Sequence, residues 1–169
     1  IPNLETMLTS KDFTRSDAII MASFLGYSVY VGRVMAGYLL DIVWAPALAC
    51  VLQMMPAISM YIFTLPDPTY AQMVIGIVVL GVAAGVEYDL LAYLVARYFG
   101  MRSYARIYGT LYAFFGLGAG FGPAIFGSIY GQTGSYDLAM QYSMWGFIIC
   151  SLSFLLLGRY RDEQLKAMV

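Results

Sequence analysis

Long apolar runs separated by short polar joints dominate the pattern of this chain. Five such runs approach or exceed the roughly 20 residues that a helix needs to cross the hydrocarbon core of a bilayer. They cover residues 17–40, 46–65, 70–99, 107–130 and 137–158. Joints such as PDPTY and GQTGSYD carry the Pro and Gly that end helices. The pattern predicts an all-α bundle of five transmembrane helices. Ser16 or Asp17 is expected to cap the first, and residues 159–169 to form a polar tail.

The composition of the chain indicates the class of protein. The chain is 61% hydrophobic and only 11% charged, whereas about a quarter of the residues of a soluble domain are charged. We therefore predict a multi-pass membrane protein whose first partner is the lipid bilayer, with no nucleic-acid partner. Histidine is absent, and Cys50 and Cys150 lie far apart in apolar runs, so the sequence predicts no metal site, cofactor or catalytic residue. An enzyme is accordingly not expected.

The basic residues indicate an orientation. They occupy alternate joints and the C-terminal tail: Arg97, Arg102, Arg106, Arg159, Arg161 and Lys166. The opposite joints carry Asp67 and Asp137 and no basic residue. By the positive-inside rule the C-terminus is expected in the cytoplasm and the N-terminus outside, in the cell membrane. An odd number of crossings also suggests that the chain is part of a longer protein.

The fourth run, GTLYAFFGLGAGFGPAIFGSIYG, has a glycine content that would weaken a helix in water. In a bilayer, small faces let helix backbones approach closely. Pro123 is expected to kink or locally break this helix, because it removes a hydrogen bond and crowds the preceding turn. Composition alone leaves open whether the helix serves conformational change or static packing.

Three motifs resemble those of the major facilitator superfamily, the twelve-helix secondary transporters built from two six-helix halves. Gly-Pro spacing in the fourth run resembles the family's Gly-Pro motif, although Phe126 stands where a Gly is usual; the matching residues are Gly109, Gly118, Gly122, Pro123 and Gly127. Gly37 and Asp41 in GYLLD resemble the core of the loop after the second or eighth helix. GVAAG followed by AYLVARYFG resembles the fourth or tenth helix.

Departures from these motifs favour the C-terminal half. Ile77 replaces the Arg of the N-terminal fourth helix, and IVWAP lacks the basic residues of the N-terminal loop. The resemblance therefore implies helices eight to twelve of a carrier whose N-terminal half is missing here, working by alternating access. Within the superfamily the chain looks most like the monocarboxylate-porter and oxalate/formate-antiporter branch, which implies symport or antiport of a small organic anion.

Arg33 is the leading candidate for substrate binding. It lies inside the first run, where a charge is costly unless it faces protein or water. Ala22, Gly26 and Gly37 fall on the same helix face within about 80°, with Tyr30 close by, so we expect Arg33 to point into the bundle. A guanidinium can bind a carboxylate through two parallel hydrogen bonds. Snorkelling to headgroups, or a structural ion pair, is an equally open alternative.

The resemblance strengthens the first interpretation, since members of the branch carry a substrate-binding Arg at this place in the eighth helix. An Asp precedes that Arg by one turn in the monocarboxylate porters, and Val29 stands there in this chain. Proton coupling through that position is therefore in doubt.

Glu87 and Asp89 are the acidic residues of the third run. Two residues apart, they project about 160° from each other around a helix and cannot share one site. Asp89 lies near the small residues Gly81 and Gly85, which favours a structural pairing at a helix contact. Glu87 is the better candidate for facing a cavity and for proton coupling, with Asp89 second.

Two other functions remain open at this point. A major facilitator carrier of a neutral solute, such as a sugar or drug, would have the same helices and motifs. A membrane subunit that transports nothing would have a similar composition.

Overall fold

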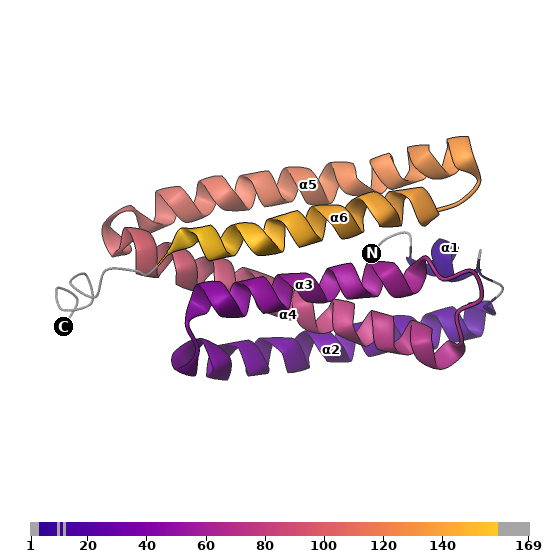
Figure 1. The fold of residues 1–169 in the computed structure, drawn as a ribbon, viewed down its shortest axis with the longest axis horizontal. Helices are drawn as coiled ribbons and strands as arrows, with labels where there is room; N and C mark the ends of the chain where they lie inside the picture. Colours follow the sequence, from indigo (N-terminus) through magenta and orange to yellow (C-terminus); the bar gives the residue numbers. More distant parts are fainter. Residues whose placement is uncertain (1–3, 10, 12, 159–169) are drawn as a thin grey trace.

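A computed structural model of the chain describes residues 4–9, 11 and 13–158, and this part is almost entirely helical (Figure 1). Five long helices run up and down: α2 Arg15–Ile42, α3 Ala45–Phe63, α4 Tyr70–Phe99, α5 Tyr104–Thr133 and α6 Asp137–Ser153. Three short elements complete them: α1 Leu4–Thr9 and the 3₁₀ turns η1 Met101–Ser103 and η2 Phe154–Leu157. Five segments of the described chain are long and apolar enough to cross a membrane, which confirms the predicted all-α bundle.

The helix ends follow local sequence chemistry. The N-cap of α2 is Thr14, whose hydroxyl accepts a hydrogen bond from the Asp17 amide at 3.2 Å, so the prediction of Ser16 or Asp17 as cap was wrong by two or three residues. Thr69 and Gln72 form a reciprocal capping box at the start of α4. Gly134 ends α5 with φ of 71°, in the left-handed region that glycine adopts without strain.

The closest helix contact joins α2 and α4 through small residues. Gly32 of α2 lies against the backbone of Val82, and Gly85 of α4 lies against the backbone of Val29. A Cβ atom added to Gly81 would lie only 2.6 Å from the Cβ of Ser28. In lipid, association of helices depends on van der Waals contact between such faces. The small residues Gly81 and Gly85, noted in the sequence, therefore mark this seam on α4.

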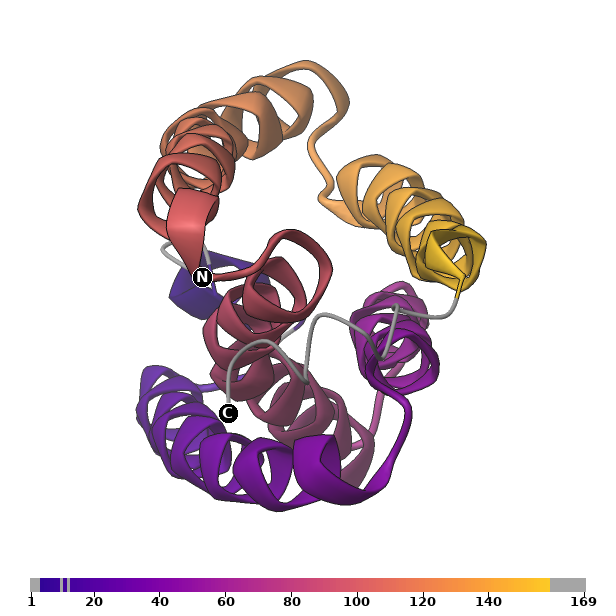
Figure 2. The ribbon, with the colours of Figure 1, turned by 90° about the vertical axis from the view of Figure 1, so that its left-hand side faces the viewer.

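The remaining helices are arranged around α4. In an end-on view α4 lies between α2 and α5, while α3 lies between α4 and α6 (Figure 2). A polar contact joins α3 to α6, because the buried Ser151 hydroxyl donates to the Cys50 carbonyl oxygen at 2.6 Å. Buried apolar clusters at the two ends of the bundle hold α2, α3 and α4 together.

Helix α5 is the least buried of the five long helices of the described chain. None of its residues is buried, and it continues through Pro123 without a break. A Cβ at Gly122 would meet no atom within 4 Å, so this glycine makes no close helix contact among the described residues. This glycine-rich face is therefore open within the part of the chain that the structure describes.

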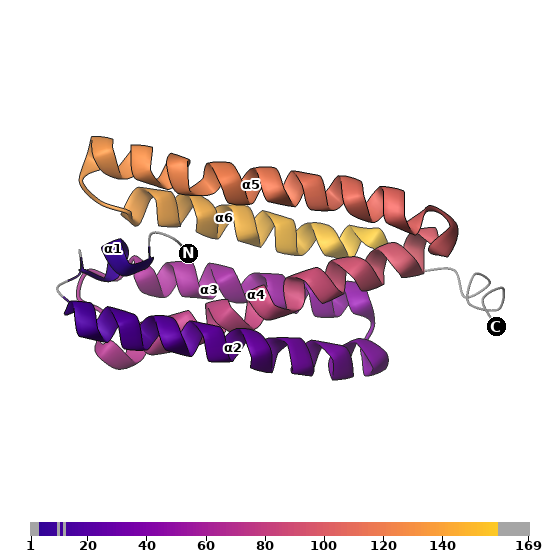
Figure 3. The same ribbon diagram turned by 180° about the vertical axis from the view of Figure 1, so that it is seen from behind.

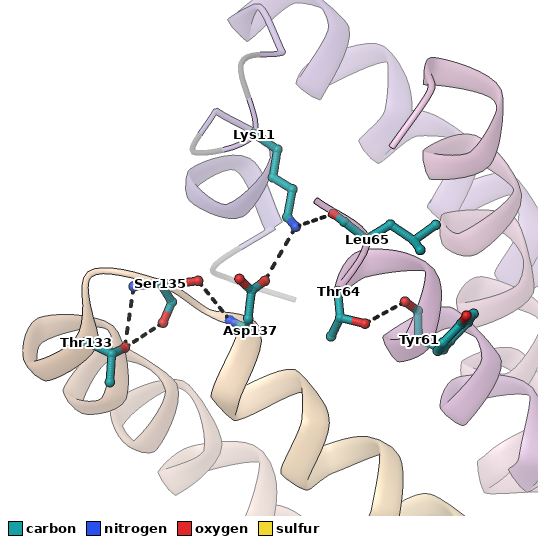
Figure 4. Close-up of polar contacts among 7 residues, drawn as sticks. All are labelled: Lys11, Tyr61, Thr64, Leu65, Thr133, Ser135 and Asp137. Atoms are coloured by element: carbon teal, nitrogen blue, oxygen red, sulfur yellow. Dashed lines mark hydrogen bonds and ion pairs between the residues drawn. The ribbon is translucent and has the colours of Figure 1, made fainter. Parts of the chain in front are cut away.

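One end of the bundle carries Asp67 and Asp137 and is closed by α1, an element that the mixed polar pattern did not predict. In the view from behind, α1 lies at this end, close to the start of α2 (Figure 3). Lys11 follows it, with a side chain only 12% exposed. Its Nζ donates to the Leu65 carbonyl at 2.7 Å and lies 3.4 Å from Asp137 Oδ1 (Figure 4). A single ammonium thus connects the segments before α2, after α3 and at the start of α6.

Candidate functional site

Arg33 and Asp89 form an ion pair across the α2–α4 seam. Arg33 Nε lies 3.5 Å from Asp89 Oδ2, and the two side chains are 53% and 44% exposed. The α2–α4 contact positions them, because the neighbouring glycines bring both backbones together. The expectation that Asp89 takes part in a pairing at a helix contact is met by this geometry. The pair is accessible from one side, so another anion could approach the guanidinium.

The helix face predicted to carry Arg33 into the bundle is not the face that packs. Residues of α2 buried in the described chain are Ala18, Met21, Leu25, Ser28, Gly32, Ala36 and Leu40. Gly26 and Gly37 are open, and a Cβ at either would meet nothing within 4 Å. Arg33 therefore lies at the border of the packed face and reaches sideways to Asp89. Tyr30, one turn before it, is 73% exposed.

Glu87 faces a different space from Asp89, as the helix geometry predicts. It lines a cleft of about 580 Å³ bounded by α1, α3, α4, α5 and α6. The cleft walls are mainly apolar, and the α5 wall includes Gly118, Gly122 and Pro123. The small residues of the Gly-Pro motif and the carboxylate of Glu87 thus border one space. Two opposite sides of α4 therefore carry the two acidic residues.

An aromatic cluster that the sequence analysis missed joins α5 to α4. Its rings come from Tyr104, Tyr108, Tyr112 and Phe115 on α5 and from Tyr88 on α4. Successive α5 rings are stacked, with centroids 5.5, 5.9 and 6.1 Å apart. Tyr88 meets Phe115 edge-on at 5.1 Å and Tyr112 at 5.9 Å. The signal was present in YARIYGTLYAFF, whose aromatic residues recur at intervals of three or four and so share a helix face.

The other motif positions lie apart from these groups. Gly37 and Asp41 are exposed in the last turns of α2, and Gly109 and Gly127 are exposed on α5. A Cβ at Gly109 or Gly127 would meet no described atom within 4 Å. The structure thus brings together Arg33 with Asp89, and Glu87 with the Gly-Pro motif.

These features together define a class of protein. It is a multi-pass helical membrane protein with an accessible ion pair inside the span and a separate, mainly apolar cleft that contains one carboxylate. The chain belongs to the Major Facilitator Superfamily, whose family model matches residues 1–167. The resemblance identified from the motifs is confirmed.

Curated relatives agree with the branch suggested by the motifs. The chain is 29% identical over 140 residues to monocarboxylate transporter 9 of Rattus norvegicus, covering 82% of this chain and 27% of the relative. It is 26% identical over 156 residues to monocarboxylate transporter 9 of Pongo abelii, covering 91% of this chain and 30% of the relative. The chain thus spans less than a third of the length of these relatives. No solved structure matches it.

Proposed function

We propose that the chain is the C-terminal part of a carrier that moves a small organic anion, a mono- or dicarboxylate, across the cell membrane by alternating access. The observation that carries this proposal is the Arg33–Asp89 pair inside the span. The family, and the name of the relatives, support transport and a carboxylate substrate. The missing N-terminal half supplies the other wall of the substrate path, and "full-length carrier" below means both halves together.

The chemistry of the pair suits reversible anion binding. Arg33 carries five N–H donors, of which the Nε edge faces Asp89 at 3.5 Å. No hydrogen bond accompanies this ion pair among the described contacts, and both side chains are about half exposed. A substrate carboxylate can therefore take the guanidinium with two parallel hydrogen bonds, which Asp89 does not make here. Tyr30 lies on the same open side and is proposed as a further contact.

Asp89 has the complementary role in this proposal. Without substrate its carboxylate neutralises Arg33, which reduces the cost of a cation inside the span. When substrate binds, the two carboxylates compete for one guanidinium. Uptake of a proton by Asp89 would release that competition. Because Val29 stands where the branch has its acidic residue, α4 rather than α2 supplies the acid partner of Arg33.

Glu87 is proposed as a second proton-coupling group, because it borders a mainly apolar cleft. The arginine-bearing end at η1 and the first turn of α5, with Arg102 and Arg106, is proposed to face the cytoplasm, with the C-terminus on the same side. The Gly-Pro motif on α5 is proposed to shape the helix that moves during transport.

The test compares three variants of the full-length carrier at matched membrane expression. Arg33→Gln should abolish saturable carboxylate binding, whereas Asp89→Asn should tighten it, because it removes the competing acid. The double variant Arg33→Gln with Asp89→Asn removes both charges, so that no unpaired charge remains in the span. If the pair only holds α2 to α4, this double variant should transport as well as the wild type. Retained carboxylate binding without Arg33 would refute the proposal and favour a neutral solute.

A further inference from the structure

The aromatic cluster of α4 and α5 is unlike the other seams of the bundle, because its rings remain partly open. Tyr112 is 47% exposed, Tyr88 and Phe115 are half-buried, and no residue of α5 is buried in the described chain. Helix packing alone needs neither phenol hydroxyls nor stacked rings, and the α2–α4 seam is built from glycine, serine and valine. The cluster therefore joins α4 to α5 and also presents open aromatic surface.

The position of Tyr88 connects this surface to the anion site. Tyr88 directly precedes Asp89, so the two residues differ by about 1.5 Å along the helix axis and by about 100° around it. On one side of Tyr88 lies Asp89, the partner of Arg33 in the ion pair. On the other side its ring meets Tyr112 and Phe115, and Tyr88 and Phe115 also line the cleft that contains Glu87. A ligand held by Arg33 would thus have these rings at its side.

We propose that Tyr88, Tyr112 and Phe115 form the subsite for the substrate's tail and select carboxylates that carry a planar aromatic or conjugated group. This inference rests on the proposed function, because it needs a carboxylate at Arg33. A flat ring one or two carbons from its carboxylate matches the adjacency of Tyr88 and Asp89. It would enter edge-to-face or offset-stacked, the arrangements that aromatic pairs prefer and that these rings already show with one another.

The selectivity follows from ring electrostatics rather than from size. A saturated ring of the same shape buries similar apolar area, but it lacks the quadrupole that favours stacking on tyrosine. The expected preference for an aromatic over a saturated ring is about two- to tenfold in affinity.

The experiment measures the affinities of the full-length carrier for phenylacetate and cyclohexylacetate, two carboxylates with the same spacer and similar ring size. The wild type should prefer phenylacetate by the factor given above. Tyr88→Leu should bring the ratio of affinities close to one, and Tyr88→Phe, which keeps the ring, should preserve the preference. Tyr142→Leu on α6, where the side chain is 68% exposed, removes a tyrosine away from the cluster and should leave the ratio unchanged.

Two results would overturn the inference in different ways. Equal affinities of the wild type for phenylacetate and cyclohexylacetate, or a preference that survives Tyr88→Leu, would show that the cluster only packs helices. If binding still depended on Arg33, the proposed function would stand. Absence of any Arg33-dependent carboxylate binding would overturn both. Tyr88→Phe also covers the case in which Tyr88→Leu fails to fold. If Tyr88→Leu is inactive and Tyr88→Phe shows no preference for phenylacetate, the result counts against the subsite.

Discussion

Replacing Gly81 by alanine tests whether the α2–α4 seam depends on glycine. The added Cβ would lie 2.6 Å from the Ser28 Cβ and 2.8 Å from the Leu25 carbonyl oxygen. Carbon atoms in contact prefer about 3.5–4.0 Å, so α2 would have to retreat by about 1 Å. Such overpacking typically costs about 1–3 kcal/mol. The same substitution replaces a helical glycine by alanine, and in water this change stabilises a helix by up to about 1 kcal/mol.

A matched control separates these two contributions. Gly26 lies in the middle of α2, and a Cβ there would meet nothing within 4 Å, so Gly26→Ala changes only the helix propensity. The difference between the unfolding free energies of the two variants therefore isolates the steric cost. We expect Gly81→Ala to be less stable than Gly26→Ala by about 1–3 kcal/mol. The free energy of unfolding of the full-length carrier in mixed detergent micelles, titrated with SDS, measures it. Equal stabilities of the two variants would refute the close packing of α2 on α4.

Three further predictions concern other parts of the chain. Lys11→Met should lower the unfolding free energy by about 1 kcal/mol or more, because a charged donor is lost from Leu65 and Asp137, and an unchanged melting temperature would contradict the role of this contact. Glu87→Gln should preserve exchange of substrate for substrate while weakening uptake driven by a pH gradient, and full proton-driven accumulation would show that Glu87 is only structural. Gly122→Leu should slow transport at normal expression, because the added side chain would project into the Glu87 cleft. Gly120 does not line this cleft, so Gly120→Leu should not slow transport, and equal rates of the two variants would contradict the role of the motif.

The helices were predictable because their signal is local. Length and hydropathy alone placed all five spans within a few residues of the observed bounds, since a bilayer demands long apolar helices. The opposite directions of Glu87 and Asp89 were also predictable, because helix geometry fixes the angle between residues two apart. Helix α1 was missed because its six residues mix polar and apolar side chains and are held by contacts distant in sequence.

The packing faces were less predictable. On α2 small residues occur on two sides, and the sequence gives no reason to choose Gly32 over Gly26 or Gly37 as the contact. That choice depends on where α4 presents Gly81 and Gly85, which is a tertiary property. The face that carries Arg33, Gly26 and Gly37 is open among the described residues for the same reason, and the ion-pair alternative for Arg33 was anticipated. The aromatic cluster needed both a helical interval within α5 and a partner, Tyr88, from another helix.

The affinity of an Arg33→Lys variant tests the central claim most directly. If Arg33 clamps a carboxylate with two parallel hydrogen bonds, lysine cannot replace it, because an ammonium acts as a point charge. The loss of a charge-assisted contact should cost roughly 1.5–3 kcal/mol, or about ten- to a hundred-fold in affinity. The measurement compares carboxylate affinity of the full-length carrier and its Arg33→Lys variant at matched membrane expression. The account predicts that large loss, and equal affinities would contradict it, because an arginine that only pairs with Asp89 or anchors the helix tolerates lysine.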